Sequence, residues 1–293
     1  MIFYEKFAFF AFLVYFCAKI SANSMVNLLK IALFLLVMVF STSCRNNDEP
    51  RLSFEILEAE QSTRLSNEER SPLCSVSLKI AAATKESGKV GEKINASVAY
   101  HLFNQESIGI KGCIEQFADN YVKTYKSNML PLYNEDRADT TKRQWYEFHY
   151  IITSTTEQTS RRTLAYLATV DYSEGHTNSI HQTIPLNFYS DTGDEISRKD
   201  IFVDGYETQL NPILLKALME RVEVNNIDEL KEKGYLQTVD IYPSENIIVG
   251  DNTITFIYNP SEIASLELGT IQLVLSYAQM EKLIKPKFLK SLQ

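Results

Sequence analysis

The feature that most constrains this chain is an apolar run at residues 31–40. It follows Lys30, and it is followed by residues 41–43, which are all small, and then by Cys44. About ten apolar residues are too few to span a bilayer comfortably as a helix, but they suit the core of a cleavable signal. A basic residue, a short apolar core and small residues before a cysteine are typical of a bacterial lipoprotein signal.

The pattern predicts cleavage before Cys44 and a diacylglycerol thioether on its sulfur. Two or three acyl chains anchor a protein stably, because each buried CH₂ contributes about 0.8 kcal/mol. We therefore interpret residues 1–43 as the signal segment, and a second apolar run at residues 7–17 suggests that translation starts at Met25. The alternatives to a lipoprotein signal are a plain secretory signal or an N-terminal membrane helix. The alternative to a start at Met25 is cleavage after residues 22–24, which would leave residues 25–40 as a second hydrophobic segment.

Composition narrows the class of protein and of partner. Hydrophobic residues make up 45% and charged residues 23% of the chain, as in an ordinary globular protein. The net charge of −8 disfavours nucleic acid as a partner, because phosphate binding needs a basic face. It favours a cationic partner through long-range attraction, although solubility alone also explains an acidic chain.

Two cysteines remain outside the signal and the lipidation site, namely Cys74 and Cys113. Outside the cytoplasm they are candidates for a disulfide. Closing a loop of about 40 residues would add about 3–4 kcal/mol if the bond is unstrained. The sequence does not fix their separation in space, so two free thiols are the alternative.

Hydrophobic periodicity indicates interleaved strands and helices. Residues 44–72 are mostly polar and are predicted to be a lipid-anchored tether, with a short strand within it. The remaining pattern predicts strands at residues 74–80, 146–152, 163–172, 184–189, 254–258 and 271–275, helices at residues 94–103, 114–126 and 277–284, and helix starts at Asn211 and Asn259.

Adjacent strands look hairpin-linked, which favours the α+β class over a parallel doubly wound sheet. We expect antiparallel sheets with helices packed on one face. Two sequential subdomains are predicted, an N-terminal one at residues 73–172 and a C-terminal one at residues 173–286.

The C-terminal half also carries a family pattern. It contains an Asp-Thr-Gly turn at residues 191–193, Gly-Tyr-Glu at residues 205–207, Tyr-Asn-Pro at residues 258–260 and a closing strand that ends at Tyr277. This order resembles a bacterial domain of unknown function, which we match to residues 173–285. That domain forms the extracellular part of lysozyme-sensing anti-sigma factors of the sigma-V type, accompanies some peptidoglycan deacetylases and occurs alone in Bacteroidetes lipoproteins.

Residues 74–172 resemble the usual N-terminal companion of that domain, through Ile94-Asn95 and Trp145-Tyr146. The family often has a Gly-Gly-Ala-His turn, where this chain has Ser-Glu-Gly-His-Thr at residues 173–177. The resemblance implies an envelope binding or sensing module. It implies neither deacetylase activity nor an anti-sigma factor of the usual build, because their catalytic and cytoplasmic parts have no counterpart in this sequence.

The sequence contains no motif that identifies a catalysed reaction. His176 and His181 are five residues apart and are the best candidates for metal ligands, but no helical His-Glu-x-x-His pattern supports them. No serine elbow, phosphate loop or dinucleotide fingerprint is present. We therefore predict no catalytic residues, no metal and no cofactor.

Tyrosines offer a candidate binding surface, because they combine a large contact area with a polar tip. With His176 and His181, the candidates for binding are Tyr146, Tyr150, Tyr166 and Tyr172. The alternative is that these tyrosines belong to the core, since tyrosine favours half-buried strands.

The leading hypothesis is a lipid-anchored protein of the cell envelope, at the outer membrane or the cell surface. It would bind or sense a protein or glycan partner without enzymatic activity, with a cationic lysozyme-like hydrolase as the sharpest candidate partner. The alternative is a hydrolase acting on peptidoglycan or polysaccharide, possibly metal-dependent through His176 and His181. A purely structural lipoprotein is the third hypothesis.

Overall fold

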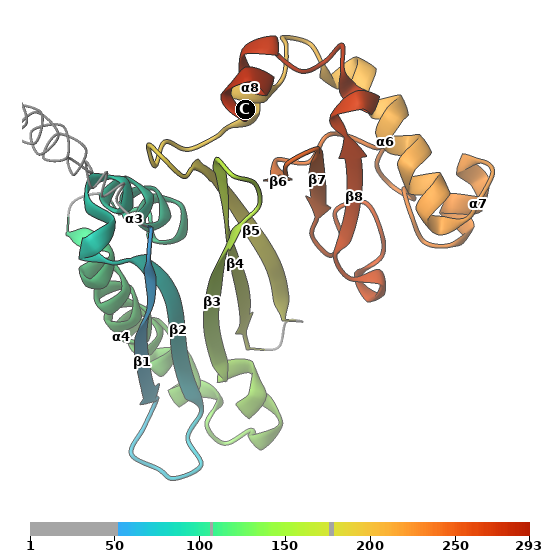
Figure 1. Cartoon of the computed structure of the whole chain (residues 1–293). Coiled ribbons are helices and arrows are strands. Elements are labelled where there is room, and N and C mark those ends of the chain that lie inside the picture. Colours follow the sequence, from blue (N-terminus) through green and yellow to red (C-terminus); the bar gives the residue numbers. More distant parts are fainter. Residues whose placement is uncertain (1–51, 106–107, 176–178) are drawn as a thin grey trace, which may run out of the picture. The chain divides into compact units, whose positions relative to one another are not determined.

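The computed structural model describes residues 52–105, 108–175 and 179–293. They form a five-stranded sheet and then a three-stranded sheet, with helices between and after them (Figure 1). The α+β class predicted from the sequence is confirmed. The predicted signal and Cys44 lie outside the described residues.

The first sheet has its strands in sequence order. They are β1 (Phe54–Arg64), β2 (Leu73–Ala83), β3 (Phe148–Gln158), β4 (Thr163–Glu174) and β5 (Ile180–Tyr189). Neighbouring strands are antiparallel except β2 and β3, which are parallel. The prediction of antiparallel sheets is wrong for this pair. Parallel strands need a crossover connection, and here two helices provide it.

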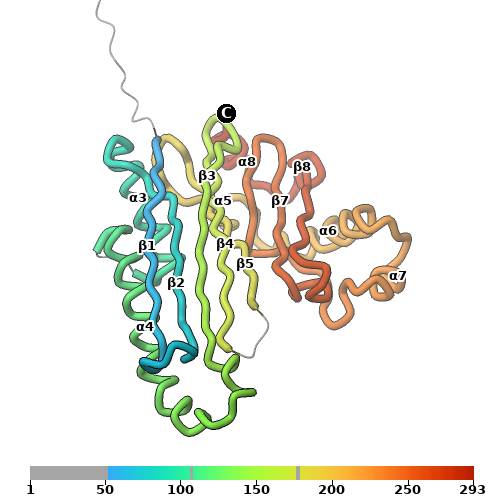
Figure 2. Tube along the Cα trace, turned by 90° about the horizontal axis from the view of Figure 1, so that it is seen from below, coloured from blue at the N-terminus to red at the C-terminus, as the bar shows by residue number. Residues whose placement is uncertain are grey.

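These two helices, α3 (Gly88–Phe103) and α4 (Gly109–Asp136), lie on the same face of the sheet (Figures 1 and 2). The prediction of helices on one face is therefore confirmed for this sheet. The apolar residues of β2 alternate with exposed or half-buried ones and face the helices, as a half-buried strand requires. The core between helices and sheet includes Val76, Leu78, Ile80, Ile94, Val98, Ile114, Ile152 and Tyr166.

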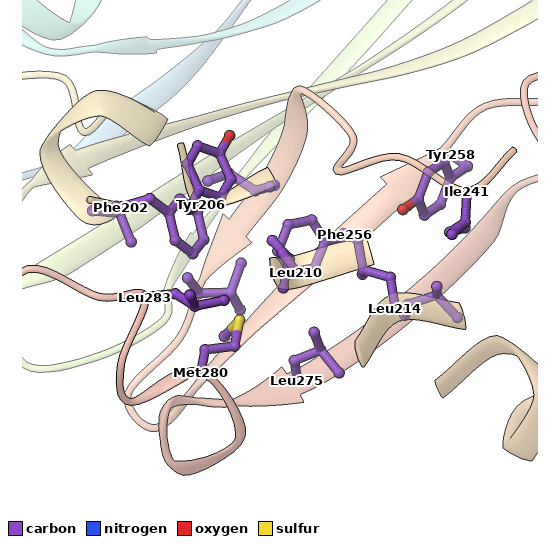
Figure 3. Close-up of a cluster of buried hydrophobic side chains, with 14 of the residues drawn as sticks. Phe202, Tyr206, Leu210, Leu214, Ile241, Phe256, Tyr258, Leu275, Met280 and Leu283 are labelled. Carbon is purple, nitrogen blue, oxygen red and sulfur yellow. The ribbon is translucent and has the colours of Figure 1, made fainter. Parts of the chain in front are cut away.

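The second sheet is antiparallel and has its own hydrophobic core. Its strands are β6 (Asn246–Val249), β7 (Thr253–Tyr258) and β8 (Ile271–Ser276), and the helices around it are α5 (Arg198–Ile201), α6 (Glu207–Val222), α7 (Ile227–Glu232) and α8 (Pro286–Ser291). Figure 3 shows the apolar face of α6, with Leu210 and Leu214, beside Phe256 of β7. Phe202 and Tyr206 stack with their ring centroids 4.4 Å apart.

Three predicted helix positions differ from the structure. Helix α6 begins at Glu207, so Asn211 lies inside it instead of capping it, because Leu210 and the preceding Tyr206 are already buried in the core. The residues directly after Asn259 form turns and bends, and the next helical segment is a 3-10 helix at Leu266–Leu268. The segment after β8 forms a 3-10 helix only over Tyr277–Met280.

Two buried asparagine side chains join the sheets. The Asn187 amide on β5 donates to the Ile247 carbonyl and accepts from the Val249 N–H of β6, both at 2.8 Å. Asn259, just after β7, accepts from the Thr183 N–H at 2.7 Å and donates to the Thr183 carbonyl at 3.3 Å. Side-chain amides thus supply between the sheets the hydrogen bonds that a strand would otherwise make.

The turn after β5 packs against α3. Gly193 has φ +70°, and a Cβ there would lie 2.5 Å from the Val90 carbonyl oxygen. The Glu195 carboxylate accepts from Ser97 Oγ at 2.6 Å and from His101 Nε2 at 3.1 Å. The hydrogen bond from His101, with that from Ser97, holds the pKa of Glu195 below its ordinary value despite burial.

The predicted division of the chain into a tether and two subdomains differs from the structure at two places. Strand β1 lies within the tether expected at residues 44–72 and pairs with β2 along its length, so the tether prediction is wrong for this part. The boundary expected after residue 172 lies inside β4, and β5 continues the same sheet to Tyr189.

Candidate functional site

The four candidate tyrosines separate into two pairs. Tyr166 is fully buried, and its hydroxyl lies 2.6 Å from Ser154 Oγ. Tyr146 is also buried and donates a hydrogen bond of 2.7 Å to Asp136 Oδ2. These two tyrosines belong to the core, which is the alternative that the sequence left open.

Tyr150 and Tyr172 instead join two aromatic residues of α4 at the end of the sheet where β4 leads into β5. They are direct partners in the β3–β4 register, and their rings stack with centroids 5.4 Å apart. Phe117 and Tyr121, one helical turn apart on α4, each lie 5.1 Å from the Tyr150 ring. All four side chains are half-buried. We call Phe117, Tyr121, Tyr150 and Tyr172 the aromatic shelf.

A pocket of about 290 Å³ opens beside the shelf. Its lining residues come from α4 and from the end of α3 and the residues just after it: Phe103, Gln105, Cys113, Gln116, Phe117, Asn120, Tyr121 and Thr124. The residues from α4 fall on one face of the helix, since their spacing follows its period. The described lining residues combine aromatic rings with amide and hydroxyl groups, and none of them carries a charged side chain.

The shelf carries neutral phenols. Burial, followed by the charge of Glu174, raises the pKa of Tyr121 well above its ordinary value. The Tyr121 hydroxyl donates to Glu174 Oε1 at 3.4 Å. Burial also raises the pKa of Tyr150. At physiological pH these hydroxyls therefore stay protonated and act as hydrogen-bond donors and acceptors rather than as charges.

The opposite face of the same strands holds a His-Asp-His cluster. Asp171 lies between His149, whose Nε2 is 3.1 Å from one carboxylate oxygen, and His181, whose Nδ1 is 2.9 Å from the other. An ionised carboxylate only accepts, so both imidazoles donate to it. Burial raises the pKa of Asp171, but the hydrogen bonds from His181 and His149 outweigh it and leave the pKa below its ordinary value. His176 lies outside the described residues.

Replacing Asp171 with asparagine is expected to lower the free energy of unfolding by about 0.5–1 kcal/mol at neutral pH, as for a partly exposed ion pair. A carboxyl group whose pKa is lowered by folding stabilises the protein above its unfolded pKa and loses this effect as pH falls through the folded pKa. The difference between wild type and Asp171→Asn should therefore vanish below the ordinary value of 3.8. Urea unfolding between pH 3 and pH 8 measures it, and a difference that does not change with pH would contradict the assignment.

Cys74 and Cys113 are both buried free cysteines, so the candidate disulfide is not formed. They belong to different hydrophobic clusters, Cys74 with Tyr125 and Tyr146 and Cys113 with the core under α3 and α4. Burial and the nearby Glu174 raise the pKa of Cys74 to about 12. A thiol of this kind stays protonated, which makes it a poor nucleophile and a poor metal ligand.

Among the described residues, no group of three or more histidine, cysteine, aspartate or glutamate side chains is arranged to hold a metal ion. No helix in that part of the chain has both the length and the apolar character needed to cross a membrane.

Of the binding residues predicted from the sequence, the structure brings only some together. Tyr150 and Tyr172 share the shelf, and His181 lies on the other face of the sheet, paired with Asp171. Sequence reasoning missed Phe117 and Tyr121 as site residues, because their helical spacing also fits a core stripe. The sequence feature that could have identified them is the presence of two amide residues, Gln116 and Asn120, at neighbouring positions of the same helix.

Comparisons with known proteins define the class of this fold. Residues 199–278 match the model of a family described as "Protein of unknown function (DUF3298)". The predicted resemblance to a bacterial domain of unknown function is confirmed for this part of the chain, which is similar to the DUF3298 family. The comparison with curated proteins found no significant match.

Two solved structures share the fold over most of the chain. A member of the DUF3298 family from Bacteroides fragilis is 24% identical, with a TM-score of 0.76 over 82% of this chain and 97% of that one. A DUF3298 family protein from Pseudomonas aeruginosa is 12% identical, with a TM-score of 0.52 over 81% of this chain and 96% of that one. At these identities the likeness establishes the fold.

Proposed function

We propose that this chain is a lipid-anchored protein of the cell envelope that binds or senses a partner without enzymatic activity of its own. The partner, a glycan or a protein, would be held at the aromatic shelf. The observation that carries the proposal is that four half-buried aromatic rings in mutual contact end beside an uncharged polar pocket. Tyrosine-rich surfaces of this kind supply contact area at low entropic cost.

Support for the anchor comes from the sequence. The apolar run at residues 31–40 and the small residues before Cys44 have the arrangement of a lipoprotein signal. The hydrophobic clusters found among the described residues are built from residues after Cys44.

The acidic chain and the family resemblance support a cationic protein such as lysozyme as one partner. The net charge of −8 would accelerate its association at low salt. The described residues that line the pocket, however, include no carboxylate. The geometry of the site thus favours a glycan over a basic side chain as the group that enters the pocket.

Replacing Cys44 with serine is expected to abolish acylation and to move the protein out of the membrane fraction, because a serine cannot carry the thioether. Metabolic labelling with palmitate and fractionation of cells that express each form measure both effects. Cys74→Ser is the matched control and should label like the wild type, since Cys74 is buried. A native protein with an intact, unmodified N-terminus would contradict the anchor.

Binding is tested with purified residues 45–293, which contain both cores. We expect the wild type to co-sediment with isolated peptidoglycan or to bind immobilised lysozyme, and the Tyr150→Ala/Tyr172→Ala variant to lose at least about tenfold in affinity. Tyr242→Ala, at an exposed tyrosine outside the shelf, is the control. Absence of binding to both partners at low salt would count against a binding function.

A further inference from the structure

The pocket beside the shelf has amide side chains with no hydrogen-bond partner among the described residues. Within the described residues, no protein group forms a hydrogen bond with the side chains of Gln105, Gln116 or Asn120, all of which line the pocket. Amides that serve the fold are paired, as Asn187 and Asn259 are. The unpaired amides are therefore available to a ligand.

We propose that this pocket binds one ring of an uncharged saccharide, with a second ring on the shelf. This inference rests on the proposed function and names the ligand class of the same site. A pyranose presents hydroxyl groups around its rim and C–H groups on its faces. Amides both donate and accept, so they match hydroxyl groups that do the same.

The aromatic rings match the other part of such a ligand. The face of an aromatic ring is negative, so it attracts the weakly positive C–H groups of a sugar face. Phe117 and Tyr121 line the pocket and are roughly parallel to each other, with an interplanar angle of 26°. Tyr150 and Tyr172 extend the aromatic surface away from the pocket, over β3 and β4.

The charge distribution selects a neutral ligand. The charged residues of α4 near the pocket pair with each other along the helix, Lys111 with Glu115 at 3.9 Å and Lys123 with Asp119 at 3.8 Å. Glu174 beside Tyr121 and the net charge of −8 oppose an anionic polysaccharide. Among the described lining residues, a cationic group would find no carboxylate.

The size of the pocket sets the length of the ligand. At about 290 Å³ it lies at the lower end of the range for small-molecule sites, which suits a single ring. Additional rings would have to lie on the open shelf. We therefore expect trisaccharides to bind more tightly than the corresponding monosaccharides.

The test uses purified residues 45–293 and four probes: N,N′,N″-triacetylchitotriose, cellotriose, trigalacturonate and hen lysozyme. Calorimetry and two-dimensional NMR should detect binding of at least one neutral trisaccharide, with shifts at the amides of α4. Trigalacturonate should bind at least about tenfold more weakly than that trisaccharide, because of like-charge repulsion. Phe117→Ala should weaken binding about tenfold or more, and Tyr242→Ala should leave it unchanged.

A second variant separates binding from folding. Gln116→Ala/Asn120→Ala changes two exposed helical positions to the residue with the highest helix propensity, so its melting temperature should stay equal or rise. It should nevertheless lose saccharide binding at least about tenfold. Asn134→Ala, at an exposed position near the other end of α4, is the matched control and should bind like the wild type.

The outcomes distinguish the two proposals. Lysozyme binding that needs Tyr150 and Tyr172, with no response to either neutral trisaccharide at millimolar concentration, would overturn the saccharide inference and leave the binding module intact. Saccharide binding that survives Gln116→Ala/Asn120→Ala unchanged would also overturn it. Absence of binding to all four probes would count against both proposals.

Discussion

Asn187→Leu is expected to lower the free energy of unfolding by about 2–5 kcal/mol, one of the two largest effects that we predict for a single substitution. The Asn187 side chain is buried, and its amide pairs with the Ile247 carbonyl and the Val249 N–H of β6 at 2.8 Å each. Leucine has the same branched shape but no polar atom, so both backbone groups would lose their partner. Each buried polar group left unpaired costs about 1–3 kcal/mol.

Chemical denaturation with circular dichroism detection measures this loss. Asn187→Asp is the informative companion, because it keeps an acceptor for the Val249 N–H but faces the Ile247 carbonyl with a negative charge. It should therefore destabilise the protein at neutral pH as well. Asn225→Leu, at an exposed position of the loop before α7 where, among the described residues, only the backbone N–H is bonded, should cost far less. Equal stability of Asn187→Leu and wild type would show that the amide is not needed to join the sheets.

Gly175→Ala is the second substitution with a large expected effect. Gly175 follows β4 with φ +78°, and a Cβ there would lie 1.9 Å from the Trp145 carbonyl oxygen. The Gly175 N–H also donates to the Glu147 carbonyl at 3.1 Å, which fixes the backbone. Neither the clash nor the left-handed backbone is relieved without moving the main chain, so we expect a loss of about 3 kcal/mol or more.

Trp145 is the single tryptophan of the chain and so reports directly on this contact. A shift of its emission maximum in Gly175→Ala, together with a lower midpoint of urea unfolding, is the expected result. Gly205→Ala is the matched control, because Gly205 has φ +72° but no neighbouring atom within 4 Å of its would-be Cβ. It should cost only about 1–2 kcal/mol, the price of the left-handed backbone. Equal losses in the two variants would show that the contact with Trp145 is not restrictive.

The sequence predicts the class of the fold because the relevant patterns are local. Alternation in β2 and the helical stripe with Ile114 and Ala118 each bury one face of a single element, and both elements are present. The parallel pairing of β2 and β3 is not local, since it depends on how two helices cross the sheet. Periodicity within a strand does not determine which neighbour the strand pairs with.

The same distinction between local and non-local information explains why only part of the candidate site could be predicted. Tyr150 and Tyr172 are half-buried and can contact a ligand, whereas Tyr146 and Tyr166 are buried. All four nevertheless lie in or beside strands of similar composition. Tyr166 lies within the core under α3 and α4 and Tyr146 packs beside Tyr133 of α4, whereas Tyr150 and Tyr172 lie at the margin of the core, and this is a property of the assembled fold. The role of Asn259 was missed for the same reason, because its partner, Thr183, lies far away in the sequence.

The acidic side chains of β1 have a consequence for a protein held at high density on a surface. Among the described strands, β1 pairs with β2 alone, so it is an edge strand. The unpaired backbone groups on its outer side are of the kind with which a strand of a second molecule pairs. Glu55, Glu58 and Glu60 are exposed along it, and identical strands brought together would set these charges against one another. At the opposite end of the sheet, Asn259 occupies backbone groups of β5. Both edge strands of the sheet are thus protected against pairing with a strand of another molecule. This favours separate molecules even at high density.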